Sequence, residues 1–316
     1  MHKRLGESFP VPRERVLADV VAGLSQPQKR LSGKYLWDET GSEIFDRICD
    51  TQDYYLTRAE TALLEAAAPE IAARIGPRAS LVEYGSGASR KVRLLLDALP
   101  EPALYVAIDI SADYLARAAA RIAQAYPGLA VHPLVADYTH AIALPDEARA
   151  PILGFFPGST IGNFPPEEVV AFLARIRETL GGGRLLIGHD PNRDEARLAR
   201  AYGEADGLMP ALHLNMLRHL ARSLGVAIDP ADFRHEIRIA RDPFRVEAHL
   251  VALRPVTIAL RDRRFALAAG ESLHTDSSYK MSVEDFLRLA TAAGFAPERS
   301  WHDAEGLYAL HLLRPE

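Results

Sequence analysis

The segment Ser80–Leu99, SLVEYGSGASRKVRLLLDAL, decides the fold. An apolar run, Ser80–Tyr84, leads into Gly85-Ser86-Gly87, and a helical pattern of apolar residues follows. This order of strand, glycine turn and helix is typical of the first βα unit of a doubly wound parallel sheet. Bare glycine backbone lets a ligand approach closely, and the helix N-terminus behind it offers unpaired N–H groups. Because a G-x-G after a strand is a weak signal, an ordinary tight turn is the alternative interpretation.

Two acidic residues extend this prediction beyond the turn. The next predicted strand, Leu104–Asp109, ends in Asp109, where a carboxylate can accept both ribose hydroxyls of a nucleoside. The third strand, Leu129–Val135, leads to Asp137, whose carboxylate can accept a hydrogen bond from the amine of an adenine. Both acids are therefore predicted to bind a nucleoside.

The residues around the glycines favour one nucleoside cofactor. Arg90 stands where a dinucleotide fingerprint has its third glycine, and Glu83 lies just before the turn. A carboxylate at Glu83 suits a cationic, amine-bearing ligand better than a pyrophosphate. The pattern therefore favours S-adenosylmethionine over NAD, although an NAD-dependent oxidoreductase or a nucleotide-binding module without catalysis stays as the rival hypothesis.

Length and composition exclude several classes of protein. The 316 residues are 48% hydrophobic and 25% charged, which suits one large or two modest globular domains. A net charge of −5 gives no electrostatic support for binding nucleic acid. The one cysteine, Cys49, excludes a disulfide framework and favours a reducing cytoplasm. No apolar run is long enough to cross a membrane, and Met1–Arg15 is too charged for a signal peptide.

Strands and helices alternate through the middle of the chain, which predicts a parallel sheet covered on both faces. The predicted strands are Leu81–Tyr84, Leu104–Asp109, Leu129–Val135, Ile152–Pro157 and Arg184–His189, and the helices between them are Arg90–Leu99, Ala112–Ala125 and Pro166–Leu180. Ligands of such sheets lie beyond the carboxyl ends of the strands, where we expect Asp190 as well. Before the sheet, Thr57 and Glu60 form a capping-box pattern that predicts a helix over Ala59–Ile75.

The alternation stops after Asp190, which predicts an inserted second domain. Asn192–Arg222 has helical spacing, Phe233–Arg241 and Phe244–Arg254 have the pattern of a hairpin, and Gly270–Lys280 is a polar segment. A last helix, Val283–Ala293, and a closing hairpin then return to the sheet. The predicted domains are 58–193 with 281–316, which binds S-adenosylmethionine, and 1–57 with 194–280, which binds the substrate.

The segment Phe155–Phe164, FFPGSTIGNF, follows the fourth strand and carries the amide of Asn163. Methyl transfer to nitrogen needs a neutral amine held in line with the donor, so orientation matters more than a strong base. A glycine-rich loop with a polar amide can hold an amine in this way. The alternative is a strand-to-helix turn in which Asn163 or a neighbour caps the helix.

Five motifs in this order resemble the histidine Nα-methyltransferases of ergothioneine biosynthesis. They are KYLWDETGSEIF (Lys34–Phe45), DYYLTRAE (Asp53–Glu60), EYGSGASRK (Glu83–Lys91), GSTIGNF (Gly158–Phe164) and HTDSSYK (His274–Lys280). The similarity covers nearly the whole chain. It implies an α/β fold, a Rossmann-like class I methyltransferase domain with a second α+β substrate domain. It also implies stepwise methylation of the α-amino group of L-histidine to the betaine, with S-adenosylmethionine as cofactor.

The resemblance also assigns site residues. It places Gly85, Ser86, Gly87, Lys91, Asp109, Asp137 and Tyr138 around the cofactor. It places Trp37, Phe45, Tyr54, Asn163, Tyr202, Ala248, Asp276 and Ser278 around the substrate, with Asn163, Tyr54 and Tyr202 orienting the reacting amine. Without the resemblance, Tyr54 and Tyr202 are interpreted as half-buried aromatic residues with a solvated hydroxyl, and Asp276 as a turn residue.

Three of these positions depart from the family pattern. The family has Tyr where this chain has Trp37, Met where it has Ala248, and Glu where it has Asp276. Asp276 and Ala248 both enlarge the space around the substrate side chain, and one methylene matters by about 1–3 kcal/mol. A bulkier amino acid, such as tryptophan or a modified histidine, is therefore the alternative substrate. Trp37 lacks a hydroxyl that could hold a partly methylated amine, which leaves the number of methyl groups open.

The sequence predicts no metal site. His189, Asp190 and His249 do not have the spacing of a zinc motif, and methyl transfer to an amine needs no metal. We expect a monomeric cytoplasmic enzyme. Its substrate is expected to be a small molecule, a free amino acid, and it is expected to have no nucleic acid or membrane partner.

Overall fold

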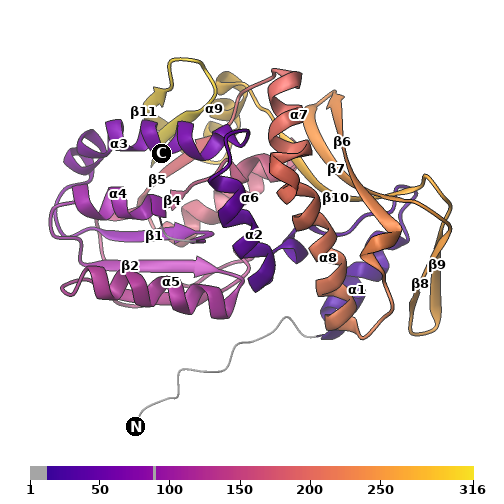
Figure 1. The fold of residues 1–316 in the computed structure, drawn as a ribbon. Helices are drawn as coiled ribbons and strands as arrows, with labels where there is room; N and C mark the ends of the chain where they lie inside the picture. The colour runs from indigo at the N-terminus through magenta and orange to yellow at the C-terminus, as the bar shows by residue number, and fades with distance from the viewer. Residues whose placement is uncertain (1–12, 88–89) are drawn as a thin grey trace, which may run out of the picture. The chain divides into compact units, whose positions relative to one another are not determined.

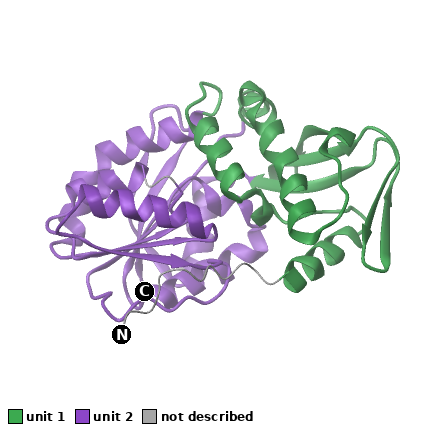
Figure 2. Cartoon of the chain, turned by 60° about the horizontal axis from the view of Figure 1, so that its bottom comes forward, with its two compact units in different colours: residues 1–54, 194–278 green, residues 55–193, 279–316 purple. Residues whose placement is uncertain are grey.

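The structure, a computed structural model, describes residues 13–87 and 90–316. The prediction that the chain carries no signal peptide concerns mainly residues 1–12, which lie outside these ranges. The chain divides into two compact units: residues 1–54 with 194–278 form unit 1, and residues 55–193 with 279–316 form unit 2 (Figure 2). Within the described ranges, no helix is long and apolar enough to span a membrane.

Unit 2 contains a seven-stranded sheet with the strand order β11-β12-β5-β4-β1-β2-β3. Its strands are β1 (Ser80–Tyr84), β2 (Leu104–Asp109), β3 (Ala130–Val135), β4 (Ile152–Phe156), β5 (Arg184–His189), β11 (Phe295–His302) and β12 (Ala309–Pro315). The first five strands pair in parallel. β12 pairs antiparallel with β5 and with β11, so the predicted C-terminal hairpin closes the sheet. The predicted α/β fold is confirmed.

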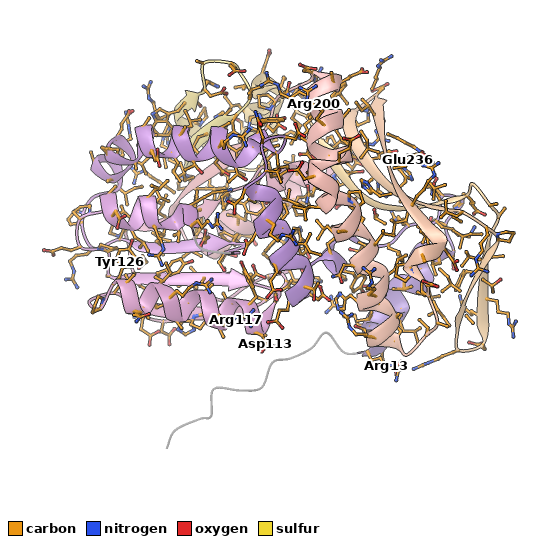
Figure 3. All side chains as sticks on the ribbon, viewed as in Figure 1. Arg13, Asp113, Arg117, Tyr126, Arg200 and Glu236 are labelled. Carbon is orange, nitrogen blue, oxygen red and sulfur yellow. The ribbon has the colours of Figure 1, made fainter. Side chains whose placement is uncertain are left out.

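Helices cover both faces of this sheet (Figure 1). On one face lie α3 (Tyr55–Ile75), α4 (Arg90–Ala98) and α5 (Ala112–Ala125), and on the other α6 (Pro166–Leu180) and α9 (Val283–Ala292). Successive residues of a strand point to opposite faces, so Leu81 belongs to the first apolar cluster and Val82 to the second. Just after α5, Tyr126 donates its phenol proton to Asp97 of α4 over 2.6 Å (Figure 3).

Unit 1 combines helices with a small antiparallel sheet. The helices are α1 (Arg13–Leu24), α2 (Glu39–Cys49), α7 (Glu195–Gly203) and α8 (Leu208–Leu224). The three-stranded sheet has the order β10-β7-β6, from β6 (Phe233–Arg241), β7 (Phe244–Ala252) and β10 (Ser272–Tyr279). A separate hairpin consists of β8 (Val256–Leu260) and β9 (Arg263–Leu267). α8 packs against β6 and against α2.

The aspartate of the first motif has a structural role in unit 1. Asp38 is the N-cap of α2, and its carboxylate accepts a hydrogen bond from the backbone N–H of Gly41 at 2.8 Å. The same carboxylate accepts hydrogen bonds from Asn215 at 2.7 Å and from Arg222 at 2.6 Å, both on α8. Asp38 therefore caps the start of α2 at Glu39, and it connects α2 to α8.

The structure differs from the sequence patterns in two places. The polar segment Gly270–Lys280 contains a strand, β10, because its polar side chains bond to neighbouring elements instead of facing water: Thr275 pairs with His213 of α8 at 2.9 Å. The capping box is also wrong, since α3 begins at Tyr55 and Thr57 lies inside the helix. The carboxylate of Glu60 has other partners, described below.

Four histidines gather inside unit 1, one from each of α8, β6, β7 and β10. The rings of His213 and His235 stack with centroids 4.7 Å apart, and those of His249 and His274 meet edge to face at 5.3 Å. Burial disfavours the charged imidazolium, and it lowers the pKa of His235 and of His274 to about 4. Burial also lowers the pKa of His213 and His249. The folded protein therefore keeps these rings neutral at pH values where the unfolded chain takes up protons.

We expect the free energy of unfolding to fall as the pH drops from about 6.5 towards 4, by up to about 1.4 kcal/mol per pH unit for each ring. Urea unfolding at pH 7.5, 6.5 and 5.5 measures this slope. His235→Phe keeps a stacking ring and should flatten the slope, whereas the exposed residue His132 provides the control His132→Asn, which should not. A slope in His235→Phe equal to that of the wild type would contradict the assignment.

Candidate functional site

The turn after β1 exposes backbone groups at the carboxyl end of the sheet. Gly85 has φ of +73°, a conformation that favours glycine. The N–H groups of Gly85 and Ser86 both donate to the carbonyl of Ile108, at 2.8 and 3.1 Å, which fixes the turn against β2. Ser86 is buried, and its hydroxyl has no hydrogen-bond partner among the described residues. A buried hydroxyl in this state is able to bond to a ligand group.

Asp109 ends β2 beside this turn, as predicted. Its carboxylate accepts hydrogen bonds from the backbone N–H of Ser111 at 2.9 Å and of Gly87 at 3.3 Å. Burial raises the pKa of Asp109, and these N–H groups oppose that rise by stabilising the anion. A carboxylate has about four acceptor sites, so Asp109 keeps capacity for hydroxyl donors. The structure thus holds it in a fixed orientation at the sheet edge.

Asp137 and Tyr138 follow β3 at the same end of the sheet. Asp137 accepts hydrogen bonds from the backbone N–H and the hydroxyl of Thr139, at 3.0 and 2.6 Å. Tyr138 packs its ring edge to face on Phe156 at 5.6 Å and on Phe172 at 6.1 Å. A side chain added at Gly85 would come within 3.7 Å of the Tyr138 ring, so this tyrosine lies close to the glycine turn.

Lys91 lies in the first turn of α4, where its ammonium pairs with the carboxylate of Glu60 from α3. The same carboxylate accepts the backbone N–H of Gly158, with its two oxygens at 2.9 and 3.0 Å. Glu60 is buried, and these bonds join the start of α4, which follows the glycine turn, to the loop after β4. Sequence reasoning missed this role, because the spacing of Glu60 from Thr57 was interpreted as a capping box.

Asn163 ends a short 3-10 helix, Thr160–Asn163, after that loop. The loop enters through Gly158 and Ser159, which have φ of +83° and +58°, and Ser159 donates its backbone N–H to the phenol oxygen of Tyr308 at 3.0 Å. Helix α6 is capped at Pro165 without a side-chain hydrogen bond, so Asn163 is not its cap. Asn163 is exposed, and its amide can therefore meet a ligand.

Four aromatic residues form a continuous row in unit 1. The ring of Trp37 meets that of Phe45 at 5.1 Å, Phe45 meets Tyr54 at 5.8 Å, and Tyr54 meets Tyr202 at 6.1 Å. Each contact is edge to face, the geometry that aromatic pairs favour. The structure thus brings together four of the predicted substrate residues, from α2, the segments next to it and α7.

The row ends in a pair of hydroxyl groups. The phenol oxygen of Tyr202 lies 3.1 Å from the hydroxyl oxygen of Ser278 on β10. Asp276 is two residues before Ser278 on the same strand, where the two side chains share one face. Its Oδ1 lies 3.0 Å from the position that a Cβ at Gly33 would take. Ala248 lies on the neighbouring strand β7, and its carbonyl accepts the hydroxyl of Thr275 at 3.1 Å.

Two residues differ from the expectation. Asp190 follows β5 at the expected edge of the sheet, but its carboxylate is fully buried and pairs with Lys280. Glu83 was interpreted as a negative charge, but its carboxyl is buried, accepts a hydrogen bond from Tyr105, and has its pKa raised to about 8 by burial. Near pH 7 this group is therefore mostly neutral.

The residues at the sheet edge fit S-adenosylmethionine. Its ribose hydroxyls and adenine amine are donors, and Asp109 and Asp137 are anchored acceptors. The buried Ser86 hydroxyl supplies one more polar group at the turn. Among the residues that the structure describes, no three His, Cys, Asp or Glu side chains come together to hold a metal.

Comparisons with known proteins agree with this geometry. Residues 16–315 match a family model described as histidine-specific methyltransferase, SAM-dependent. The chain is 35% identical over 306 residues to the histidine N-alpha-methyltransferase of Mycolicibacterium smegmatis, which covers 95% of this chain and 94% of that protein. It is 30% identical over 295 residues to ergothioneine biosynthesis protein 1 of Neurospora crassa, covering 90% of this chain and 33% of that one. A solved S-adenosylmethionine-dependent methyltransferase from Clostridium acetobutylicum shares the fold over 86% of this chain and 98% of its own, with a TM-score of 0.50 and 11% identity.

The raised pKa of Glu83 predicts a pH effect on stability. The unfolded chain releases this proton near pH 4.5 and the folded protein only near pH 8, so stability should fall with rising pH by up to about 1.4 kcal/mol per pH unit. Urea unfolding of the wild type and of Glu83→Gln between pH 6.5 and 8 isolates the effect, because the histidines titrate equally in both proteins. The slope of the wild type should be lower than that of Glu83→Gln, and the exposed Glu65→Gln should behave as the wild type. Equal slopes in the wild type and in Glu83→Gln would refute the neutral form.

Proposed function

Because the chain belongs to the family of S-adenosylmethionine-dependent, histidine-specific methyltransferases, we propose that it methylates the α-amino nitrogen of free L-histidine. The product would be Nα-trimethylhistidine, the betaine of ergothioneine biosynthesis. The observation that carries this proposal is the row of rings in unit 1, which ends at the hydroxyls of Tyr202 and Ser278.

Unit 2 would hold the methyl donor. The carboxylate of Asp109 would accept the ribose hydroxyls, and that of Asp137 would accept the adenine amine. The glycine turn, with the Ser86 hydroxyl, would receive the methionine portion, and Lys91 and Tyr138 would border it. When bound, S-adenosylmethionine would supply a methyl carbon that a neutral amine can attack, with the thioether S-adenosylhomocysteine as the leaving group. Because Glu83 is mostly neutral near pH 7, it does not supply the negative charge that the sequence offered to a cationic cofactor, and the proposal rests on Asp109, Asp137 and the glycine turn instead.

Unit 1 would recognise the amino acid. Tyrosine hydroxyls and an amide can anchor a carboxylate and an amine without adding a charge that competes with the sulfonium. Tyr54, Tyr202 and Asn163 would do this for the backbone groups of histidine. Asp276 and Ser278 would accept hydrogen bonds from the imidazole N–H groups. Aromatic faces stabilise ammonium groups by cation–π attraction, so the row from Trp37 to Tyr202 suits an amine that gains methyl groups and a permanent charge.

Orientation would supply most of the catalysis. An amine that has lost its proton needs no strong base, and effective molarities of well-oriented reactants reach about 10⁵ M or more. The side-chain oxygen of Asn163 would accept a hydrogen bond from the amine and direct its lone pair. The backbone of this loop is fixed through Glu60 and Tyr308, which supports such a role.

Three residues support an alternative substrate. Ala248 is small and Asp276 is short, so the side chain that they face could be larger than imidazole, as in tryptophan or a modified histidine. Trp37 has an aromatic ring but no hydroxyl that could hold a partly methylated amine. The transfer of three methyl groups is therefore a proposal as well. We further propose that the protein acts in the cytoplasm as a monomer, on the sequence grounds given above.

Asn163→Ala should lower kcat for histidine methylation by at least tenfold, because the amine loses its orienting partner. The affinity for S-adenosylhomocysteine, measured by calorimetry, should stay within twofold. Gln124→Ala removes an exposed amide from α5 and should leave both values unchanged. Wild-type kcat in Asn163→Ala would remove Asn163 from the reaction.

A competition assay with an equimolar mixture of free amino acids should show histidine consumed first, as followed by mass spectrometry of the products. Ala248→Met and Asp276→Glu reduce the space around the side chain. Each should lower the specificity constant for tryptophan relative to histidine by about tenfold or more, the effect of one or more methylene groups. If the wild-type protein prefers tryptophan, the chemistry stands and the histidine assignment is wrong.

A further inference from the structure

The chain passes between the two units three times, after Tyr54, after Arg193 and after Ser278. Each passage has a buried polar side chain close to it on the unit 2 side. These are Tyr55 at the first passage, Asp190 and Asn192 at the second, and Lys280 at the third. These four residues bond to one another, and we call them the crossover clamp. All of them belong to unit 2, yet they come from three distant parts of the sequence.

The clamp is centred on the carboxylate of Asp190. Its Oδ2 accepts hydrogen bonds from the ammonium of Lys280 and from the phenol of Tyr55, both at 2.6 Å. Its Oδ1 accepts the backbone N–H of Asn192 at 2.8 Å, and the Asn192 amide donates to the Tyr55 oxygen at 2.9 Å. Asp190 is 0% exposed and Lys280 is 1% exposed. The three passages are therefore tied to one buried carboxylate.

The clamp also holds the loop that carries Asn163. The backbone N–H of Asp190 donates to the hydroxyl of Ser159 at 2.9 Å, inside that loop. Gly162 packs so tightly that a Cβ there would lie 2.8 Å from the carbonyl oxygen of Tyr279, the residue before Lys280. The segment that leads to Asn163 thus contacts Asp190 of the clamp and Tyr279, the neighbour of Lys280.

Stability alone does not explain a buried ion pair in this place. Taking two charges out of water costs several kcal/mol per ion, and an apolar pair of similar volume is often as stable or more so. Hydrogen bonds to a buried carboxylate, in contrast, fix the relative positions of their donors. Tyr54 is bonded to Tyr55, and Ser278 is two residues before Lys280, so two proposed substrate residues are close to the clamp along the chain.

We infer that Tyr55, Asp190, Asn192 and Lys280 are positioning residues of the methyl transfer, which set the Asn163 loop and the starting points of the segments that carry Tyr54 and Ser278. The inference rests on the proposed function for the roles of Asn163, Tyr54 and Ser278. The arrangement itself rests only on contacts within unit 2.

Two variants test the clamp. Tyr55→Phe removes one hydroxyl from the clamp and keeps its ring. Asp190→Leu with Lys280→Met replaces the ion pair by apolar side chains. In both, kcat per folded molecule, measured well below the thermal midpoint, should fall at least tenfold, while the affinity for S-adenosylhomocysteine stays within twofold. Hydrogen–deuterium exchange of peptides that span residues 157–163 should become at least tenfold faster. A structural role alone would change the midpoint without these losses.

Tyr126→Phe is the matched control, because it removes a phenol hydrogen bond in unit 2 at a site outside the clamp. It should change neither kcat nor exchange of the loop. Wild-type kcat and loop exchange in a folded Tyr55→Phe or in the double variant would overturn the inference. If the wild-type chain methylates no amino acid, the proposed function fails, and the exchange measurement still decides whether the clamp fixes the loop.

Discussion

A parallel sheet brings the carboxyl ends of its strands to one edge, and the candidate site of unit 2 depends on that constraint. The glycine turn after β1, Asp109 at the end of β2 and Asp137 after β3 lie there because the three strands are neighbours in the sheet. Backbone N–H groups hold both carboxylates in place. Acceptors fixed in this way need little reorganisation when a nucleoside binds.

Unit 1 supplies a different chemistry. Its aromatic row and hydroxyl pair carry little charge, which suits a substrate whose nitrogen must be neutral to react and becomes cationic as it gains methyl groups. Buried polar networks connect elements within unit 2. Glu60 joins α3, α4 and the loop after β4, and Asp190 joins the unit 2 ends of the three passages of the chain. The protein thus combines fixed acceptors with a row of uncharged side chains.

Sequence patterns could predict the elements whose signals are local. The strand–glycine–helix pattern at Ser80–Leu99 and the Asp109 strand end are found where periodicity places them. β10 was missed because its side chains are polar and satisfied by tertiary partners such as His213. The motif around Thr57 and Glu60 was misread for a related reason, since Glu60 bonds to Lys91 and Gly158, which are distant in sequence. Networks such as the one around Asp190 join residues 135 and 90 positions apart, and no local pattern reveals them.

The charge of Glu83 shows the same limit for electrostatics. A carboxylate before the glycine turn suggests a negative charge, but burial raises its pKa to about 8, although the hydrogen bond from Tyr105 acts in the opposite direction, so the group is mostly neutral near pH 7. The most direct test of the account is the position of the methyl groups on the product. Histidine incubated with the protein and isotopically labelled S-adenosylmethionine should carry the label on its α-nitrogen, as resolved by NMR and fragment masses. Label on an imidazole nitrogen, or on no amino acid at all, would contradict it.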